Sequence, residues 1–381
     1  MTEDGFAPIP LGLNDDRRGR IRRANRRLAM VMAAVAALFM AAATFIYMST
    51  VQAGERDALR QLQTFNDLRH DAILAFFETH ENEAQIWAEN AEFEERAREI
   101  FIDWQLMSPA EKTGIRNHLV KGEPLSDPTP AQATYLTHYR RITPQLEDFI
   151  EHHNFYDLFL FTPEGELAYT VVREDDFGLD YADPSNPYYA TGLGRTARQA
   201  ATFDIHSGEE LPTAVSDFAP YAPSGGSMEA FIAEPLPYQN GTEKLGVLAI
   251  QLSFAELNTI LEYRSGLRES GKTLLVGADK RIRNDPARLP KGASLDLDTE
   301  AVNAALAGET YFGRSTGERG QPVYVAAQPL DFHELRWAVL TEMDRAEVLG
   351  PLRIYLWVWL AALLGIAVTA ALMYQILRLR R

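Results

Sequence analysis

The sequence contains no cysteine. Disulfide bonds, thiolate nucleophiles, cysteine-ligated zinc and iron–sulfur clusters are therefore all excluded. The sequence also lacks a basic excess, because 37 Lys and Arg residues stand against 53 Asp and Glu residues, which gives a net charge of −16. A nucleic-acid-binding protein needs a basic face to neutralise phosphates, so nucleic acid is excluded as a partner.

The short motifs of common catalytic and metal sites are missing as well. The sequence has no Gly-x-Ser-x-Gly, no His-Glu-x-x-His and no phosphate-binding loop. The run from Gly192 to Ala197 matches part of a dinucleotide-binding fingerprint, but no buried parallel strand precedes it. His152 and His153 are adjacent, so they do not share a helix face as metal ligands. We expect no catalytic residue, no metal site and no cofactor.

Two long runs without a charged residue lie near the ends of the chain, from Leu28 to Met48 and from Ile354 to Leu377. At about 1.5 Å per residue, the shorter run reaches about 30 Å as a helix, which is the thickness of a bilayer core. We therefore expect transmembrane helices at residues 28–50 and 351–377. A cleaved signal peptide is the alternative for the first run, but this run is longer than the apolar core of such peptides.

Arginine residues beside the two runs predict their orientation. Arginines from Arg17 to Arg27 precede the first run, and Arg378, Arg380 and Arg381 follow the second. Because arginine beside a span stays in the cytoplasm, residues 1–27 and 378–381 are expected there. The region between the spans then lies outside. Since it has no cysteine, its own core must stabilise it, and we expect a periplasmic domain anchored in a bacterial inner membrane.

Residues 51–152 have a helical pattern. From Glu55 to Met107 there is neither Pro nor Gly, and apolar residues recur at spacings of three and four. This pattern predicts one long helix, or two stacked helices, continuing from the first span. Ser108 and Thr129 each precede a proline. Ser and Thr favour the N-cap of a helix and proline favours its first turn, so we expect a helix to begin at each of these positions. Pro144 lies inside the last helical stretch, where we expect it to break or kink the helix.

From Asn154 onward the hydrophobic period changes to that of strands, and the strand pattern occurs twice. The first copy covers residues 153–262 and the second covers 263–350. Three segments recur in the same order: 157–167 as Lys272–Ile282, Glu229–Leu236 as Val323–Leu330, and Gly246–Gln251 as Trp337–Glu342. We infer a duplicated antiparallel-sheet module.

Two such modules, after a long helix and between two spans, resemble the double Cache domain of bacterial transmembrane receptors. The resemblance covers about residues 51–350 and is carried by Tyr156–Arg173, 216–221, Ala230–Leu252, Gly271–Asp285 and Pro322–Glu342. It implies an α+β fold with two PAS-like sheet modules, of which the first is membrane-distal and holds the ligand while the second is membrane-proximal. It also implies a receptor that senses a small extracytoplasmic solute and transmits a conformational signal inward, without being an enzyme.

One subset of the family binds amino acids through an Arg-x-Trp-Tyr motif and a later Asp. Residues 185–189 keep an aromatic pair in that neighbourhood, but the arginine is missing, which argues against an amino-acid ligand. Polar groups among aromatic walls are typical of ligand pockets, and the candidate ligand-binding residues here are Arg173, Tyr188, Tyr189, Asp217 and Tyr221. In the alternative interpretation the tyrosines fill the core and the charges lie on loop surfaces. The acidic pair Asp175-Asp176 is expected to be solvated.

The expected partners follow from the same architecture. The long helix favours a parallel homodimer, because two copies would bury the apolar stripe that remains after domain packing. Members of the family usually continue into a chemotaxis signalling helix, a histidine kinase or a nucleotide cyclase. The sequence ends at Arg381, so the output would come from a longer product or from a separate partner protein. Two alternatives remain: a two-span scaffold such as a polysaccharide chain-length regulator, and a membrane-anchored hydrolase.

Overall fold

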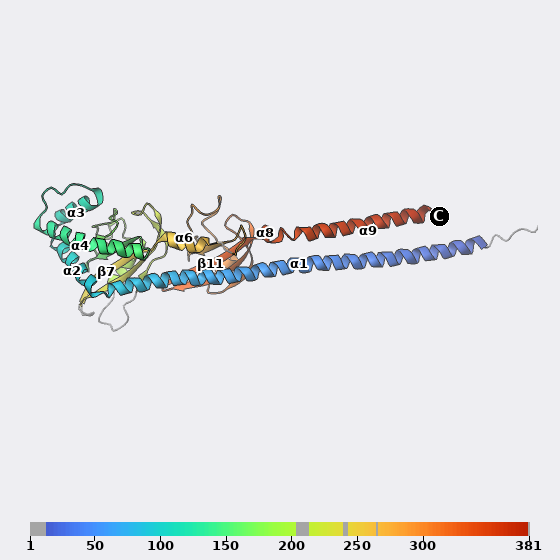
Figure 1. The fold of residues 1–381 in the computed structure, drawn as a ribbon, viewed down its shortest axis with the longest axis horizontal. Helices are drawn as coiled ribbons and strands as arrows, with labels where there is room; N and C mark the ends of the chain where they lie inside the picture. Colours follow the sequence, from blue (N-terminus) through green and yellow to red (C-terminus); the bar gives the residue numbers. More distant parts are fainter. Residues whose placement is uncertain (1–12, 203–212, 239–242, 264–265, 380–381) are drawn as a thin grey trace, which may run out of the picture. The chain divides into compact units, whose positions relative to one another are not determined.

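The computed structural model describes residues 13–202, 213–238, 243–263 and 266–379 of the chain. Residues 1–12 of the predicted cytoplasmic N-terminus, and Arg380 and Arg381 of the predicted cytoplasmic end, lie outside this part. The chain divides into two compact units, one made of Met1–Ala58 with Arg345–Arg381 and the other of Leu59–Asp344. Figure 1 labels their helices and strands along the chain.

The first unit consists of helices, and many large apolar side chains of its two long helices are exposed. It contains the first part of α1 (Leu13–Ala88), together with α8 (Arg345–Leu349) and α9 (Arg353–Leu379). Both α1 and α9 are long and apolar enough to cross a membrane, and none of their most apolar window is buried in the protein. Within the unit, Trp359 donates from Nε1 to Thr44 Oγ1 at 3.0 Å. The two apolar helices predicted from the sequence are therefore present.

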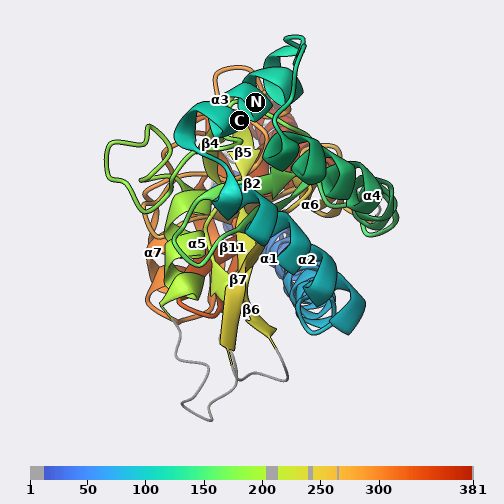
Figure 2. The ribbon, with the colours of Figure 1, turned by 90° about the vertical axis from the view of Figure 1, so that its left-hand side faces the viewer.

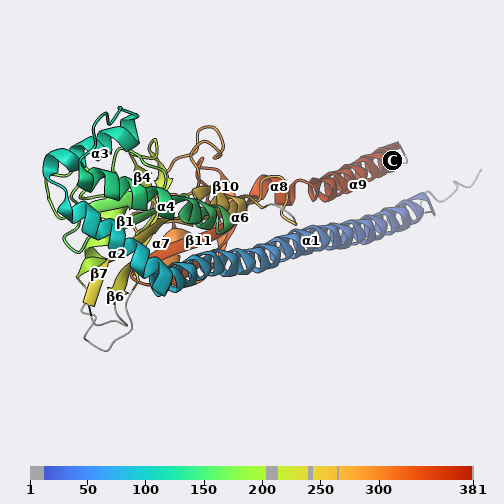
Figure 3. The same cartoon turned by 60° about the vertical axis from the view of Figure 1, so that its left-hand side comes forward.

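Helices form one end of the second unit, and their starts follow the sequence signals. Asn90 ends the long helical stretch, because its side chain accepts from Phe93 N and begins a new helix. Ser108 and Thr129 form capping boxes with Glu111 and Gln132, as expected. The resulting helices are α2 (Ala91–Leu106), α3 (Pro109–Lys121) and α4 (Pro130–His152), which lie around the first sheet (Figure 3).

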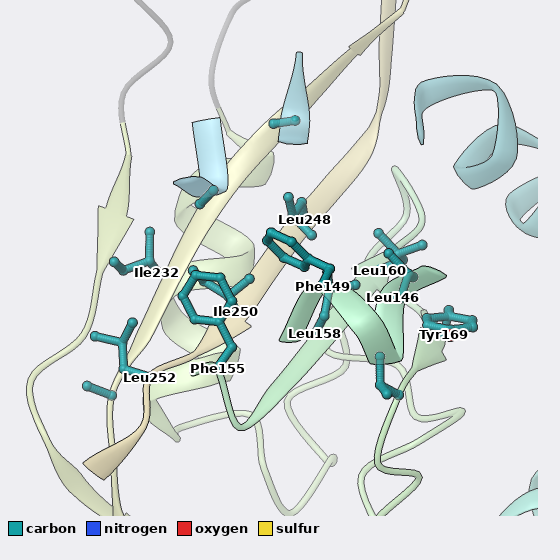
Figure 4. Close-up of a cluster of buried hydrophobic side chains, with 14 of the residues drawn as sticks. Leu146, Phe149, Phe155, Leu158, Leu160, Tyr169, Ile232, Leu248, Ile250 and Leu252 are labelled. Carbon is teal, nitrogen blue, oxygen red and sulfur yellow. The ribbon is translucent and has the colours of Figure 1, made fainter. Parts of the chain in front are cut away.

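Pro144 does not break α4, so the predicted break is wrong. Tertiary contacts on both sides of the proline explain why the helix continues. Before it, the Tyr135 and Tyr139 hydroxyls donate to the carbonyl oxygens of Ala168 and Thr170 on strand β2 (Leu167–Thr170), at 2.6 and 2.8 Å. After it, Leu146 and Phe149 are buried in the same core (Figure 4). Packing along the whole face outweighs the one backbone hydrogen bond that a proline removes.

The first sheet has five antiparallel strands in the order β2-β1-β7-β6-β3. A separate two-stranded hairpin, β4-β5, follows β3 in the chain. Helix α5 (Gly192–Ala201) packs on the sheet, and α6 (Phe254–Glu262) leads from β7 toward the second sheet. The strands are β1 (Asp157–Phe161), β2 (Leu167–Thr170), β3 (Ala214–Val215), β4 (Ala219–Tyr221), β5 (Ser227–Glu229), β6 (Phe231–Tyr238) and β7 (Glu243–Gln251).

The second sheet repeats the pairing of the first, in the order β8-β11-β10-β9. In both sheets the first strand pairs with the last strand, and the last strand forms a hairpin with the strand before it. The register also repeats, because Leu236 pairs with Gly246 just as Leu330 pairs with Trp337. The strands are β8 (Lys272–Val276), β9 (Tyr311–Thr316), β10 (Pro322–Phe332) and β11 (Leu335–Asp344), with α7 (Glu300–Leu306) packed on them.

The fold prediction is therefore confirmed: a long N-terminal helix and two antiparallel-sheet modules. The two sheet modules also differ from the predominantly helical body expected of a chain-length regulator. One strand is weaker in the second copy, since the equivalent of β2 forms only isolated bridges at Arg281 and Ile282.

Helices cover both faces of the strands. Figure 2 shows α1, α2 and α4 on one side and α5 and α7 on the other. The α1 side contains one core shared by both sheets, whereas α5 and α7 each cover a smaller core of their own sheet. Phe77 of α1 lies where the modules meet: its ring stacks on Trp337 of the second sheet at 5.0 Å and lies 6.1 Å from Phe218 of the first module.

The close packing at Gly246 gives a test of this register. A Cβ at this position would overlap the Phe161 carbonyl oxygen and approach the Phe101 ring to 2.8 Å. Because a backbone atom cannot move aside, we expect Gly246→Ala to destabilise the second unit by about 2 kcal/mol and to lower its unfolding temperature by several degrees.

The matched control is Gly19→Ala, where the nearest neighbour of an added Cβ is Arg23 Nη2 at 3.9 Å. Thermal unfolding of the full chain in detergent measures both variants. Equal unfolding temperatures for Gly246→Ala and the parent would contradict the register.

Candidate functional site

A cavity of about 260 Å³ lies beside the N-terminus of α5, and we call it the α5 pocket. Its walls come from four parts of the first module: the loop that leads into α5, the first turns of α5, the β4-β5 hairpin and β6. The residues that matter below are Pro187, Thr191, Arg195, Tyr221, Glu229 and Phe231. A cavity of this size fits a small solute, since pockets for drug-sized ligands begin at about 300 Å³.

Two glycines allow α5 to pack closely at this place. A Cβ at Gly192 would meet Ser216 Oγ at 2.7 Å, and one at Gly194 would meet the carbonyl oxygen of Tyr188 at 2.7 Å. Thr191 caps the helix by accepting from Gly194 N at 3.2 Å. The glycine run that resembles a dinucleotide fingerprint thus serves helix packing.

A buried acid lies behind the pocket wall. The Asp176 side chain is fully buried, and its Oδ2 accepts a hydrogen bond of 2.5 Å from the Tyr221 hydroxyl. Burial raises the pKa of Asp176 to about 6, and burial also raises the pKa of Tyr221 far above its ordinary value, so this tyrosine remains a donor. The Tyr181 hydroxyl lies 3.3 Å from that of Tyr221. The expectation that Asp176 is solvated is therefore wrong, while its neighbour Asp175 is exposed.

A second buried acid lines the pocket itself. Glu229 is 4% exposed, and its Oε1 accepts a hydrogen bond from the Ser227 hydroxyl. Its other carboxylate oxygen, Oε2, is buried and has no hydrogen-bond partner of normal geometry. Burial raises the pKa of Glu229, although the polar side chains of Ser227 and Gln251 favour the charged form. Nearby Glu174 accepts from the Tyr156 hydroxyl at 3.0 Å.

Of the five predicted binding residues, the structure places Tyr221 on the wall of the pocket. Tyr188 does not line the pocket, and its ring lies 6.1 Å from the Tyr221 ring. Tyr189 instead packs its ring under the Arg198 guanidinium, 3.6 Å from the ring centre. Arg173 has a left-handed backbone with φ of 64°, and its Nε donates to the Val171 carbonyl at 3.1 Å. Neither of these two residues lines the α5 pocket.

Asp217 has a different place, at the contact between the two modules. Its carboxylate accepts from Arg283 Nε at 3.1 Å and from Arg283 Nη2 at 2.7 Å, and it also accepts from Trp337 Nε1 at 2.7 Å. The guanidinium is almost completely buried. The next residue, Phe218, enters the shared core. We call Asp217, Arg283 and Trp337 the module junction.

Sequence reasoning missed Asp176, Glu229 and Arg283. Asp176 follows another acid and Glu229 follows a loop rich in Gly and Ser, so both look like loop-surface residues. Nothing local indicates that Asp176 is buried beside a tyrosine 45 positions away. A weak signal existed at Arg283, because it directly follows Lys272–Ile282, the segment of the second module that repeats residues 157–167.

A second cavity, of about 560 Å³, lies in the second module beside α7. Its charged groups already have partners: Asp298 pairs with Lys280 at 2.9 Å, and the buried Glu318 pairs with Lys272 at 2.6 Å. Among the residues that the structure describes, no group of three potential metal ligands occurs. The α5 pocket, whose buried acid has no cationic partner, is therefore the stronger candidate site.

No protein-family profile and no curated protein matches the sequence. Solved structures do match. The ligand-binding domain of the Pseudomonas fluorescens chemoreceptor CtaA in complex with L-isoleucine is 15% identical with a TM-score of 0.44, covering 78% of this chain and 97% of that chain. The sensory domain of the Campylobacter jejuni chemoreceptor Tlp3 is 12% identical with a TM-score of 0.44, covering 79% and 98%. The extracellular domain of the histidine kinase candidate vpHK1S-Z8 is 9% identical with a TM-score of 0.46, covering 80% and 96%.

The buried Asp176 gives a pH-dependent prediction. Its pKa is raised from 3.8 to about 6 by burial, so the folded chain holds this proton more tightly than the unfolded chain. The resulting stability is fully present below about pH 4 and is lost as the pH rises through about 6. The difference corresponds to roughly 3 kcal/mol. We expect Asp176→Asn to remove this part of the pH dependence.

The measurement is thermal unfolding of the full chain in detergent between pH 4 and pH 7. Asp175→Asn is the matched control, because it removes the same charge from an exposed neighbour. Identical pH profiles for Asp176→Asn and Asp175→Asn would rule out the buried acid.

Proposed function

We propose that this chain is a double Cache receptor of a bacterial inner membrane, which binds a small extracytoplasmic solute in the α5 pocket and transmits a conformational signal inward. The observation that carries the proposal is the continuity of residues 216–221. Tyr221 lines the pocket, Phe218 enters the shared core, and Asp217 binds the second module. A solute that moves the β4-β5 hairpin would thus act on the second module directly.

The duplicated fold supports this function. The first module carries the pocket, and the second module contacts both α1 and the junction. A signal needs two arrangements of these parts with different affinity for the solute. A shift from 1:99 to 99:1 requires about 5.5 kcal/mol, and a micromolar ligand has about 8 kcal/mol in total. One small solute can therefore drive the change.

The two apolar helices support a two-pass membrane protein. Arginines lie before the first and after the second, so both termini are assigned to the cytoplasm and residues 51–350 to the periplasm. Leu68 and Ile86 are apolar α1 residues more than half exposed in the second unit, which supports pairing of two copies along α1. Output then comes from a cytoplasmic domain or a partner protein, and the chain itself acts as a sensor and not as an enzyme.

The first test is a solute screen on the full chain in nanodiscs. A ligand that binds only the native state raises the unfolding temperature by mass action. We expect at least one amine, organic acid, amino acid or purine to raise it, and we expect the effect to require an open pocket. Phe231→Trp fills the cavity and should abolish the shift. If no solute of these classes binds, the sensor function is contradicted.

The second test concerns the module junction. Asp217→Asn weakens the bidentate pair with Arg283 while keeping the size of the side chain. We expect the ligand still to bind, because Asp217 does not line the α5 pocket. The ligand-induced change in amide hydrogen exchange of β11 should be lost, because the junction no longer connects the modules.

Asp331→Asn is the matched control, since Asp331 forms a bidentate pair with Arg336 on the exposed β10-β11 hairpin. Ligand-induced exchange in β11 that persists in Asp217→Asn would show that the junction does not transmit the signal.

A further inference from the structure

One acid without a paired cation, Glu229, lines the α5 pocket, and two more lie near it. Glu174 and Asp176 belong to one loop and Glu229 to β5, and the charge of Glu174 contributes to raising the pKa of both other acids. The positive charge of Arg116 favours the charged form of Asp176, but the two do not form an ion pair. The Arg116 guanidinium instead donates to the backbone carbonyls of Phe177 at 2.8 Å and Asp175 at 2.6 Å. Across the described part of the chain, the ion pairs that form leave these three carboxylates out.

Glu229 points to a missing counter-charge. The side chain is 4% exposed, and its Oε2 atom is buried without a hydrogen-bond partner of normal geometry. A buried carboxylate in this state is costly unless a positive group or further donors compensate it. The cavity beside α7 shows the contrast, because Lys272 already pairs with its buried Glu318. Glu229 itself is one of the residues that line the α5 pocket.

Two aromatic residues, Tyr221 and Phe231, also line this pocket. The Tyr221 and Phe231 rings lie 5.0 Å apart edge to face, and Tyr188 lies 6.1 Å from Tyr221. The electron-rich faces of aromatic rings attract an ammonium group, by about 2 kcal/mol when the site is desolvated. A buried carboxylate beside aromatic rings therefore favours a cation over a neutral solute.

Arg195 is the basic residue of the pocket wall, and it does not reverse this preference. Its side chain is exposed, and Nη1 donates to the Ala190 carbonyl at 2.6 Å. Solvent screens its charge, whereas Glu229 is shielded from water. The N-terminus of α5 could also attract an anion, but one of its backbone N–H groups, that of Gly194, already donates to the Thr191 hydroxyl.

We propose that the α5 pocket binds a small organic cation, an amine or quaternary ammonium ion, with Glu229 as its counter-ion. This inference rests on the proposed sensor function and names the ligand class of its site. The ammonium group lies against Glu229 and the Tyr221 ring, and the remainder of the solute extends toward Arg195 and the solvent.

The test is titration calorimetry on the full chain in nanodiscs with choline, ethanolamine and putrescine. 3,3-Dimethyl-1-butanol, the uncharged counterpart of choline, is the matched control ligand. It tests the importance of the positive charge on the unchanged protein. We expect at least one of the three cations to bind, and the butanol to bind at least tenfold more weakly than choline if choline is that cation. Glu229→Gln keeps the shape of the side chain and should weaken cation binding at least tenfold, whereas Glu151→Gln, which removes an exposed acid outside the pocket lining, should change it less than threefold.

The unfolding temperature of ligand-free Glu229→Gln checks its fold. Cation binding that is equal in Glu229→Gln and the parent overturns the inference, as does equal binding of choline and the butanol. Succinate and L-alanine are titrated in parallel. If one of these binds and the cations do not, the sensor function stands and the cation assignment is wrong. If none of the six solutes binds, the cation assignment is overturned, and the wider screen decides the sensor function.

Discussion

One carboxylate connects the two sheet modules of this molecule. Asp217 accepts three hydrogen bonds from Arg283 and Trp337 of the second module, although it belongs to the first. The Trp337 ring in turn stacks on Phe77 of α1 with an interplanar angle of 11°. A charged group held by three donors and a stacked ring has little freedom. Movement of the β4-β5 hairpin must therefore either move the second module or break these contacts.

Residues 216–221 gain their importance from strand periodicity. Successive side chains of an extended segment point to opposite sides, so one short stretch can contact two environments. Here Asp217 reaches the second module while Phe218 enters the core near Phe77. Tyr221, three positions later, lines the pocket and donates to the buried Asp176. Tyr221, which binds the buried Asp176, and Asp217, which forms the module junction, thus lie a few positions apart in one segment.

The sequence predicted the sheets well because strand pairing follows the local apolar pattern. The repeat of Glu229–Leu236 in Val323–Leu330 reappears in the register, where Leu236 and Leu330 occupy equivalent positions. The site was predicted less well, because burial of a charge depends on partners far away in the chain. Asp217 looked like a pocket residue beside Tyr221, yet its partner Arg283 lies 66 positions away. Pro144 shows the same limit, since packing of α4 outweighs a local helix-breaking residue.

The central claim is that a solute in the α5 pocket changes the environment of Trp337 through Asp217. Fluorine NMR of the full chain with 5-fluorotryptophan tests it most directly, because the sequence has 5 Trp residues and Trp337→Phe assigns the resonance. Saturation with a pocket ligand should shift the Trp337 resonance in the parent and leave it in place in Asp217→Asn. A Trp337 resonance that does not move at saturation in the parent would contradict the account.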